Sequence, residues 1–251
     1  MHKILAKTLF LGKDILHLSE CHSTNNVALQ KYRNNEASEG SIVITDQQNA
    51  GRGQRGNVWE SEPHQNLTFS LVLTPRFLDP REQFGLNMAI ALGIREALAA
   101  YGSGIVVKWP NDIVHEQGGK IGGILIENTI SQRGMEVSIV GIGLNINQTS
   151  FSYLTATSMA RLFGGPQDKW EILEEVIFNI EHFYLLLKNK GVKPLKDFYT
   201  SHLFRFGELA PYDDGEKFIG KITGIADQGK LIIQKEAGDI REYAFKEVRF
   251  L

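Results

Sequence analysis

One stretch of the chain, residues 47–60 (QQNAGRGQRGNVWE), concentrates residue types that can bind an anion. Its glycines allow main-chain N–H groups to approach a ligand closely, because they adopt backbone conformations closed to other residues. Its arginines present planar charged groups that match carboxylate or phosphate oxygens, and Trp59 supplies a flat face that can cover a ligand. The pattern predicts an anion-binding loop, although a glycine-rich surface hairpin with solvated arginines has the same composition. It is neither a Walker loop nor a dinucleotide-binding GxGxxG loop, since Arg55 breaks the latter spacing.

Four further blocks place small, polar or charged residues at strand and turn positions. They are STN (23–25), KWPND (108–112), GKIGGILIE (119–127) and GIGLNIN (141–147). Glycines inside a strand often mark the close approach of a ligand or of another backbone, and Lys120 stands at the start of such a strand. Together with the glycine-rich loop, the blocks follow the order found in biotin protein ligases, which this chain resembles strongly over about residues 15–150.

The resemblance implies a reaction in two steps. The carboxylate of biotin attacks the α-phosphate of ATP, which arrives with Mg²⁺, and gives biotinyl-5′-AMP and pyrophosphate. The ε-amine of a lysine on a biotin carboxyl carrier domain of a biotin-dependent carboxylase then attacks the activated acyl carbon. Arg52, Arg55 and Lys120 would stabilise the anions, and Asp112 would orient Lys120 or help to hold the metal ion. No metal site of the protein's own is expected.

The resemblance also assigns binding residues, with two departures from the family pattern. The biotin pocket would be lined by Ser23, Thr24, Asn25, Gln48, Gly51, Arg52, Gly53, Lys120, Gly122 and Gly123. The adenylate would contact Gln54, Arg55, Trp59, Asn111 and Asn145. Several relatives have arginine at the position of Gln54, so this loop carries one charge fewer, which predicts weaker retention of the adenylate. His22 stands where relatives commonly have an acidic or small residue.

Two alternatives remain open on the sequence alone. A lipoate or octanoyl transferase of the same superfamily would have a similar fold with a long apolar acyl tunnel, but the GRGQRG and KWPND blocks favour biotin. A regulatory module would bind the adenylate without transferring it, but Lys120 and the loop arginines argue against a lost activity. Only about twenty residues precede the STN block, so the resemblance is to monofunctional ligases without an N-terminal DNA-binding domain.

Composition narrows the remaining classes of protein. Lys and Arg number 27 against 29 Asp and Glu, a net charge of -2, so no nucleic-acid partner is expected. Lysines interrupt the apolar runs near the N-terminus before they reach the length of a signal peptide or membrane span. The single cysteine, Cys21, excludes an internal disulfide and suits a reducing compartment. We therefore expect a cytoplasmic protein with no membrane partner, either a monomer or a weak homodimer.

The pattern of elements predicts an α/β (α+β) fold. Its core would be a mixed, largely antiparallel sheet flanked by helices, which the resemblance identifies as a class II synthetase-like ligase domain. The expected strands are 14–19, 41–46, 67–73, 105–109, a hairpin within 112–127, and 135–147. The expected helices are 23–32, 82–102, a short one within 148–163, 168–190 and a shorter one from Pro194 toward His202. After Gly207, short strands separated by turns predict a small SH3-like β-barrel. The expected domains are 1–204 for catalysis and 205–251 for the small β domain.

Overall fold

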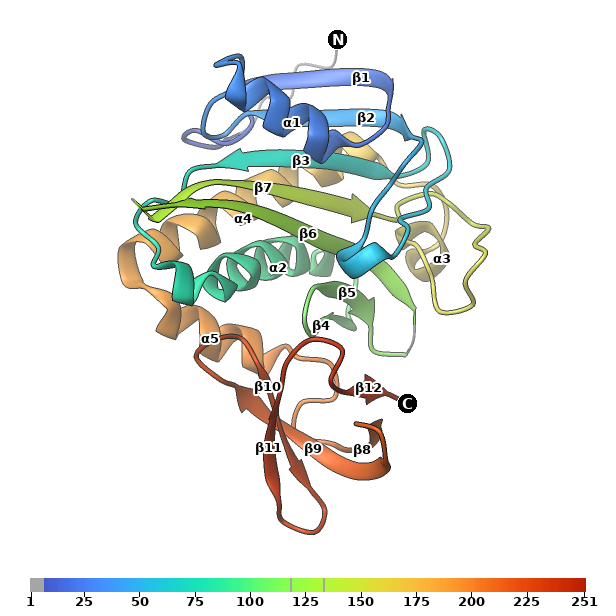
Figure 1. Cartoon of the computed structure of the whole chain (residues 1–251). Coiled ribbons are helices and arrows are strands. Elements are labelled where there is room, and N and C mark those ends of the chain that lie inside the picture. The colour runs from blue at the N-terminus through green and yellow to red at the C-terminus, as the bar shows by residue number, and fades with distance from the viewer. Residues whose placement is uncertain (1–6, 118, 133) are drawn as a thin grey trace.

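The computed structural model describes residues 7–117, 119–132 and 134–251 (Figure 1). A seven-stranded sheet with helices on both faces is followed by a smaller five-stranded sheet. The strands of the large sheet are β1 (Ile15–Cys21), β2 (Ile42–Gln48), β3 (Leu67–Leu73), β4 (Ile105–Lys108), β5 (Asp112–His115), β6 (Lys120–Ser131) and β7 (Gly134–Leu144). The helices are α1 (Thr24–Arg33), α2 (Phe84–Ala99), α3 (Met159–Phe163), α4 (Lys169–Lys190) and α5 (Val192–Ser201), with the 3₁₀ turns η1 (Gln54–Gly56) and η2 (Pro80–Glu82).

The large sheet is mixed and largely antiparallel, as predicted. Its strand order is β1-β2-β3-β7-β6-β5-β4. β1 and β2 are parallel and are connected through α1, whereas every other neighbouring pair is antiparallel. The parallel register pairs Cys21 with Gln48, so the start of α1 lies beside the end of β2. The long hairpin of β6 and β7 lies in the middle of the fold (Figure 1).

Side chains of the strands point alternately into two apolar layers, one on each face of the large sheet. On β2, Ile42 and Ile44 pack into the layer that contains α2 and α4, whereas Val43 packs into the layer beneath α1. Successive side chains of a strand point to opposite faces of the sheet, so a strand that is apolar at every position is buried on both sides. Residues 41–46 (SIVITD) therefore contribute to a strand that is covered on both faces.

α2 is apolar nearly all round because it lies between the sheet and α4. Gly93 permits this crossing, since a Cβ there would lie 2.6 Å from the main chain of Ile180. The predicted helix over 82–102 is confirmed, with its ends at Phe84 and Ala99. Asp79 caps the preceding turn η2, where its carboxylate accepts the main-chain N–H of Arg81.

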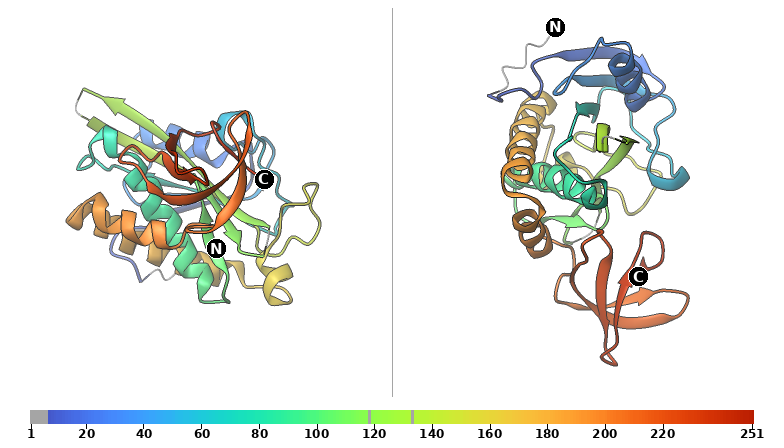
Figure 2. Two further views of the ribbon diagram at one scale, coloured as in Figure 1. Left: turned by 90° about the horizontal axis from the view of Figure 1, so that it is seen from below. Right: turned by 60° about the vertical axis from the view of Figure 1, so that its left-hand side comes forward.

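The C-terminal part is an antiparallel sheet in the order β11-β10-β9-β8-β12. Its strands are β8 (Leu209–Asp213), β9 (Lys217–Ile225), β10 (Leu231–Lys235), β11 (Ile240–Tyr243) and β12 (Arg249–Phe250). Glycines with positive φ, Gly215, Gly229 and Gly238, lie in the three predicted turns. Figure 2 shows this sheet beyond α5 and below the large sheet. The predicted small β domain is thus confirmed, and its expected boundary at 204/205, between α5 and β8, stays a prediction.

None of the helices in the described ranges has the length and apolar character needed to cross a membrane.

Candidate active site

A cavity of about 530 Å³ opens on the α1 face of the large sheet. Its lining comes from the start of α1, the glycine-rich loop, β3, the β4–β5 turn, β6, β7 and the chain after β11. The predicted residues that line it are Ser23, Thr24, Asn25, Gln48, Arg52, Gly53, Gln54, Trp59, Asn111, Asp112, Lys120 and Gly123. Most of the residues selected from five separate sequence blocks therefore meet at one site.

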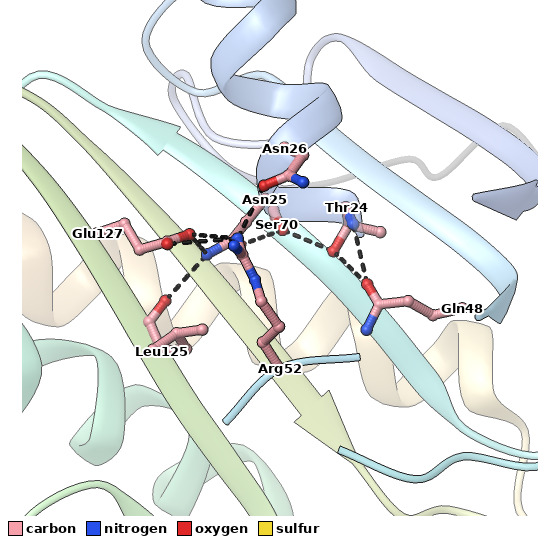
Figure 3. Close-up of polar contacts among 8 residues, drawn as sticks. All are labelled: Thr24, Asn25, Asn26, Gln48, Arg52, Ser70, Leu125 and Glu127. Atoms are coloured by element: carbon pink, nitrogen blue, oxygen red, sulfur yellow. Dashed lines mark hydrogen bonds and ion pairs between the residues drawn. The ribbon is translucent and has the colours of Figure 1, made fainter. Parts of the chain in front are cut away.

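The start of α1 carries a continuous chain of polar side chains (Figure 3). The main-chain N–H of Thr24 donates to Gln48 Oε1 at 2.9 Å. Ser70 Oγ, on β3, lies 2.7 Å from Thr24 Oγ1 and 2.6 Å from Asn25 Oδ1. Ser23 occupies the N-cap position of α1, but its side chain makes no capping hydrogen bond. This corner of the cavity is polar and uncharged.

Glu127 on β6 joins this polar corner to the glycine-rich loop (Figure 3). Its carboxylate accepts from Asn25 Nδ2 at 2.6 Å and from Arg52 Nη2 at 3.2 Å. Arg52 also donates to Asn26 Oδ1 at 2.7 Å. Sequence reasoning gave no role to Glu127 or Ser70, because their partners lie far away in the sequence, on α1 and the glycine-rich loop. Glu127 ends the GKIGGILIE block, but the block does not reveal these contacts.

The glycine-rich loop folds into a short hairpin that covers the cavity. Arg52 pairs with Val58 in an isolated antiparallel bridge, and the main-chain N–H of Trp59 donates to Gly51 O at 3.0 Å. The Trp59 ring lies directly on Gly143 of β7, where any larger side chain would collide with it. Its indole N–H is buried without a hydrogen-bond partner among the described residues. The loop therefore brings an unused donor to the cavity.

Lys120 and Asp112 form an ion pair in the cavity, with 2.6 Å between Nζ and Oδ1. Lys120 Nζ also lies 5.9 Å from the centroid of the Trp59 ring. The same Nζ lies close to Gly123. The β5–β6 pairing shifts register here, because Ile113 is opposite Gly122 whereas Val114 is opposite Lys120. Such irregularities redirect a side chain relative to the regular alternation of a strand. The predicted proximity of Lys120 and Asp112 is thereby seen in the structure.

Lys108 is a further cation of the lining, and the sequence analysis gave it no role. Its neighbour Val107 points into the core beneath α2, so alternation directs Lys108 toward the opposite face. Desolvation lowers the pKa of its ammonium group; Asp112 opposes this shift, and Arg205 and Lys120 add to it. The available signal was the KWPND motif itself, of which Lys108 is the first residue.

The end of the chain forms the remaining wall of the cavity. Phe245, Lys246, Val248, Arg249 and Phe250 line it, although they belong to the C-terminal part. Arg249 is held there by Asp213, with 2.6 Å between Nη2 and Oδ2. These residues are about a hundred positions from the rest of the lining along the chain, and no local pattern marks them. Sequence reasoning therefore missed this wall.

Three predicted ligand contacts lie behind the lining. Gly122 points to the opposite face of β6, where a Cβ would lie 2.5 Å from Leu144 Cδ2. Gly51 packs against the main chain of Trp59. Asn145 is buried and its Nδ2 donates to Thr157 O at 3.0 Å, which fixes the segment after β7. These three residues pack behind the lining, and Asn145 Oδ1 is buried without a hydrogen-bond partner among the described residues, so their predicted ligand contacts stay predictions.

The side chain of Arg55 lies outside the described part of the structure, so its predicted role stays a prediction. The described residues contain no group of three or more His, Cys, Asp or Glu side chains that could hold a metal ion. Asp112 is the one acidic residue of the described lining. Chemically, the cavity combines an uncharged polar corner with cations and a single carboxylate.

The chain is similar to proteins of known activity over most of its length. The profile of the Biotin/lipoate A/B protein ligase family matches residues 19–147. The bifunctional ligase/repressor BirA of Bacillus spizizenii is 31% identical over 95% of this chain and 74% of its own. The biotin–[acetyl-CoA-carboxylase] ligase of Paracoccus denitrificans is 30% identical over 88% of this chain and 94% of its own. The solved structure of the biotin protein ligase from Aquifex aeolicus, in complex with biotin and ATP, has 29% sequence identity and a TM-score of 0.79, and the similarity covers 95% of this chain and 100% of that chain. The present chain therefore belongs to the biotin/lipoate A/B protein ligase family.

Proposed function

We propose that this protein activates biotin with ATP to biotinyl-5′-AMP and transfers biotin to a lysine of a biotin carboxyl carrier domain. The observation that carries the proposal is the composition of a single cavity, which combines an uncharged polar corner with the cations Arg52, Lys108 and Lys120. A bicyclic urea with a carboxylate tail, bound beside a nucleoside triphosphate, needs both kinds of surface. The similarity to a ligase solved with biotin and ATP supports the same assignment.

The polar corner suits the ureido ring of biotin. Gln48 accepts the Thr24 N–H through its Oε1, so its amide NH₂ remains to donate to a ligand carbonyl. Thr24 and Asn25 line the same corner, and Ser70 behind them hydrogen-bonds to both. An aliphatic acyl chain offers no acceptor to the amide NH₂ of Gln48, whereas the ureido carbonyl of biotin does. This argument favours biotin over a lipoyl or octanoyl group.

The cations suit the first half-reaction, in which two anions must approach each other. The biotin carboxylate oxygen forms a bond to the α-phosphorus, and the bond from that phosphorus to the bridging oxygen breaks, releasing pyrophosphate. Lys120, Lys108 and Arg52 would offset the repulsion between carboxylate and triphosphate, with Lys246 and Arg249 extending the charge toward the chain end. Mg²⁺ would enter as part of the ATP substrate and neutralise further charge; Asp112 is the carboxylate of the lining that would face it.

The second half-reaction needs an amine to reach the acyl carbon while water is kept away. The acceptor lysine attacks the acyl carbon in its neutral form, AMP leaves with the electron pair, and the amine proton is released. Trp59 and the loop hairpin would shield the acyl phosphate until the acceptor arrives, because the ring already packs on Gly143 at the cavity floor. The proposed acceptor is a carrier domain with an exposed lysine, and the proposed location is the cytoplasm, where ATP is available.

The proposal is tested with the purified protein, ATP, labelled biotin and a biotin carboxyl carrier domain, beside an identical reaction with lipoate. A carrier whose acceptor lysine is replaced by arginine serves as the control. We expect pyrophosphate release that depends on biotin, and label only on the intact carrier. Preferential transfer of lipoate would identify the acyl-transferase alternative instead. Adenylate that forms or binds but never reaches the carrier would identify the regulatory module.

A further inference from the structure

Lys108 is held by an aromatic ring of the C-terminal sheet instead of a carboxylate. Its Nζ lies 4.9 Å from the centroid of the Phe250 ring. The other two cations discussed above have anionic partners, since Arg52 pairs with Glu127 and Lys120 with Asp112. No carboxylate of the described residues forms an ion pair with Lys108.

The Phe250 ring is fixed by its own neighbours. Phe204 stacks on it with 6.5 Å between ring centroids, and Tyr212 meets it edge-on at 5.3 Å. The residue after it, Leu251, is held through its carbonyl oxygen, which accepts from Arg205 Nη1 at 3.0 Å. Phe250 itself pairs with Tyr212 in the β12–β8 ladder. The ring is therefore placed by the C-terminal sheet, and Figure 1 shows β12 below β4 and β5.

An aromatic ring and a carboxylate affect a lysine differently. Both stabilise the ammonium form, but a carboxylate also neutralises the charge and competes with an incoming anion. The charged groups that face Lys108 are Asp112 on β5, Lys120 on β6 and Arg205 after α5. The cations Lys246 and Arg249 line the same cavity from the chain end. In this largely cationic setting, the ring stabilises a charge that remains available to a ligand.

We propose that Phe250 is a positioning residue for adenylate formation: its ring keeps the Lys108 ammonium group charged and directed into the cavity, where it meets the anions of biotin and ATP. This inference rests on the proposed function, which supplies those anions. It gives the C-terminal sheet a part in the chemistry of a cavity built mainly by the large sheet.

The test compares three changes at one position with a matched control elsewhere in the same sheet. Phe250→Leu keeps an apolar side chain but removes the ring, whereas Phe250→Trp keeps an aromatic face. Phenylalanine analogues with increasing fluorination at position 250 keep the shape and weaken the attraction of the ring for a cation. Phe218→Leu is the control, because Phe218 stacks on Tyr212 and Tyr243 in the same sheet and does not line the cavity.

Two measurements report on the charge of Lys108, the first directly and the second through the reaction. The first is the rate at which an amine-reactive reagent labels Lys108 as a function of pH, measured without substrates by mass spectrometry. The second is the pH dependence of biotin-dependent pyrophosphate release. Loss of a cation–π contact should lower the pKa of Lys108 by about 0.4–1.5 units in Phe250→Leu. The fall in the rate of adenylate formation at alkaline pH should move to lower pH by the same amount. The shift should grow with the number of fluorine atoms on the ring.

In Phe250→Trp and in Phe218→Leu, Lys108 should titrate as it does in the unmodified protein. An unshifted Lys108 titration in Phe250→Leu would overturn the proposal, and so would an equal shift in Phe218→Leu, which would point to general loosening of the sheet. If the unmodified protein releases no pyrophosphate with biotin, the proposed function fails on its own. The labelling titration still decides the contact between Phe250 and Lys108 in that case.

Discussion

Arg52, Lys108 and Lys120 differ in what holds them in the cavity, and this difference separates their roles. Arg52 is bound to Glu127 at 3.2 Å and reaches the site from a loop. Lys120 is bound to Asp112 at 2.6 Å and stands at the start of a strand. The backbone of Lys120 is therefore fixed by the strand, and an ion pair sets the direction of its side chain. A group that stabilises charge developing in a transition state needs such a fixed position.

Replacement of Lys120 by alanine should largely abolish adenylate formation and leave the fold intact. The side chain is 37% exposed, so its removal opens no core cavity, whereas loss of one charged stabiliser of a transition state typically costs about 10²–10³ in rate. Biotin-dependent pyrophosphate release, measured beside circular dichroism, checks both halves of the prediction. Lys188→Ala, at an exposed lysine near the end of α4, is the control. Near-normal release by a folded Lys120→Ala protein would show that the assignment is wrong.

The glycine-rich loop is attached to the rest of the fold at two places, Trp59 and Arg52. The Trp59 ring packs on Gly143, and Arg52 bonds to Asn26 and forms an ion pair with Glu127. Because both partners are more than 40% exposed, the pair is worth about 0–1 kcal/mol. The loop can therefore detach locally at Arg52 at little cost when no ligand is bound.

Trypsin cleavage after Arg52 should accordingly be suppressed by biotin plus ATP and accelerated by Glu127→Gln without ligand. In the first case bound anions order the loop, and in the second the arginine loses its charged partner. The expected acceleration is up to about fivefold, the equivalent of about 1 kcal/mol. Glu136→Gln, at an exposed position on the neighbouring strand, is the control. Equal cleavage with and without ligands would contradict a loop that orders on binding.

The segment before β1 is attached to α4 through one buried carboxylate. Glu181 is 5% exposed and accepts the main-chain N–H groups of Leu9, Phe10 and Leu11 at 2.6, 2.8 and 2.9 Å. Hydrogen bonds to a charged acceptor contribute about 1.5–3 kcal/mol, more than bonds between neutral groups. A single side chain thus satisfies three main-chain donors, of which that of Leu11 is buried.

Glu181→Gln should therefore destabilise the protein by about 2–3 kcal/mol. The amide keeps one acceptor oxygen but turns its NH₂ group toward main-chain donors. The free energy of unfolding by urea measures the effect, and Glu174→Gln, at a partly exposed position on the same helix, is the control. Equal stability of the two variants would mean that the three hydrogen bonds contribute nothing net.

Sequence patterns predicted the elements well because the relevant signals are local. The β-branched run of residues 41–46, the apolar run of α2 and the Asp168 cap of α4 each act within a few residues of where they are read. The site was less accessible, because strand alternation and tertiary contacts decide which residues of a motif reach the cavity. Gly123 lines it and Gly122 does not, although both stand in the same motif. Glu127 and Phe250 act through partners that no spacing in the sequence reveals.

At the scale of the whole molecule, the two sheets meet at the KWPND turn. Trp109 Nε1 donates to Gly229 O at 2.8 Å, and the Trp109 ring packs edge-on against Phe245. Lys108 and Trp109, neighbours on the large sheet, therefore both contact the C-terminal sheet. Conditions that loosen the C-terminal sheet should also disturb the cavity.

Acid is such a condition, because the C-terminal sheet depends on two ionised carboxylates. Hydrogen bonds from Lys235 and Tyr243 lower the pKa of Asp214 to about 2, and the Gly215 N–H together with Arg249 lowers the pKa of Asp213. A carboxylate whose pKa is lower in the folded state adds stability above its unfolded pKa of about 3.9. That stability is lost as the pH falls from about 4 toward 2, because the folded protein must then bind protons at these groups.

Asp214→Asn should consequently flatten the decline in stability between about pH 4 and pH 2, and lower stability at neutral pH. Hydrogen exchange of the C-terminal sheet, followed from pH 6 downward with correction for intrinsic rates, should show loss of protection there before loss of protection in α2. Asp227→Asn, at a fully exposed carboxylate of the β9–β10 turn, should leave the acid decline unchanged. Because Arg249 and Phe250 line the cavity from this sheet, binding of biotin and ATP should weaken over the same pH range. An identical acid profile for Asp214→Asn and the unmodified protein would mean that acid sensitivity resides in the large sheet instead.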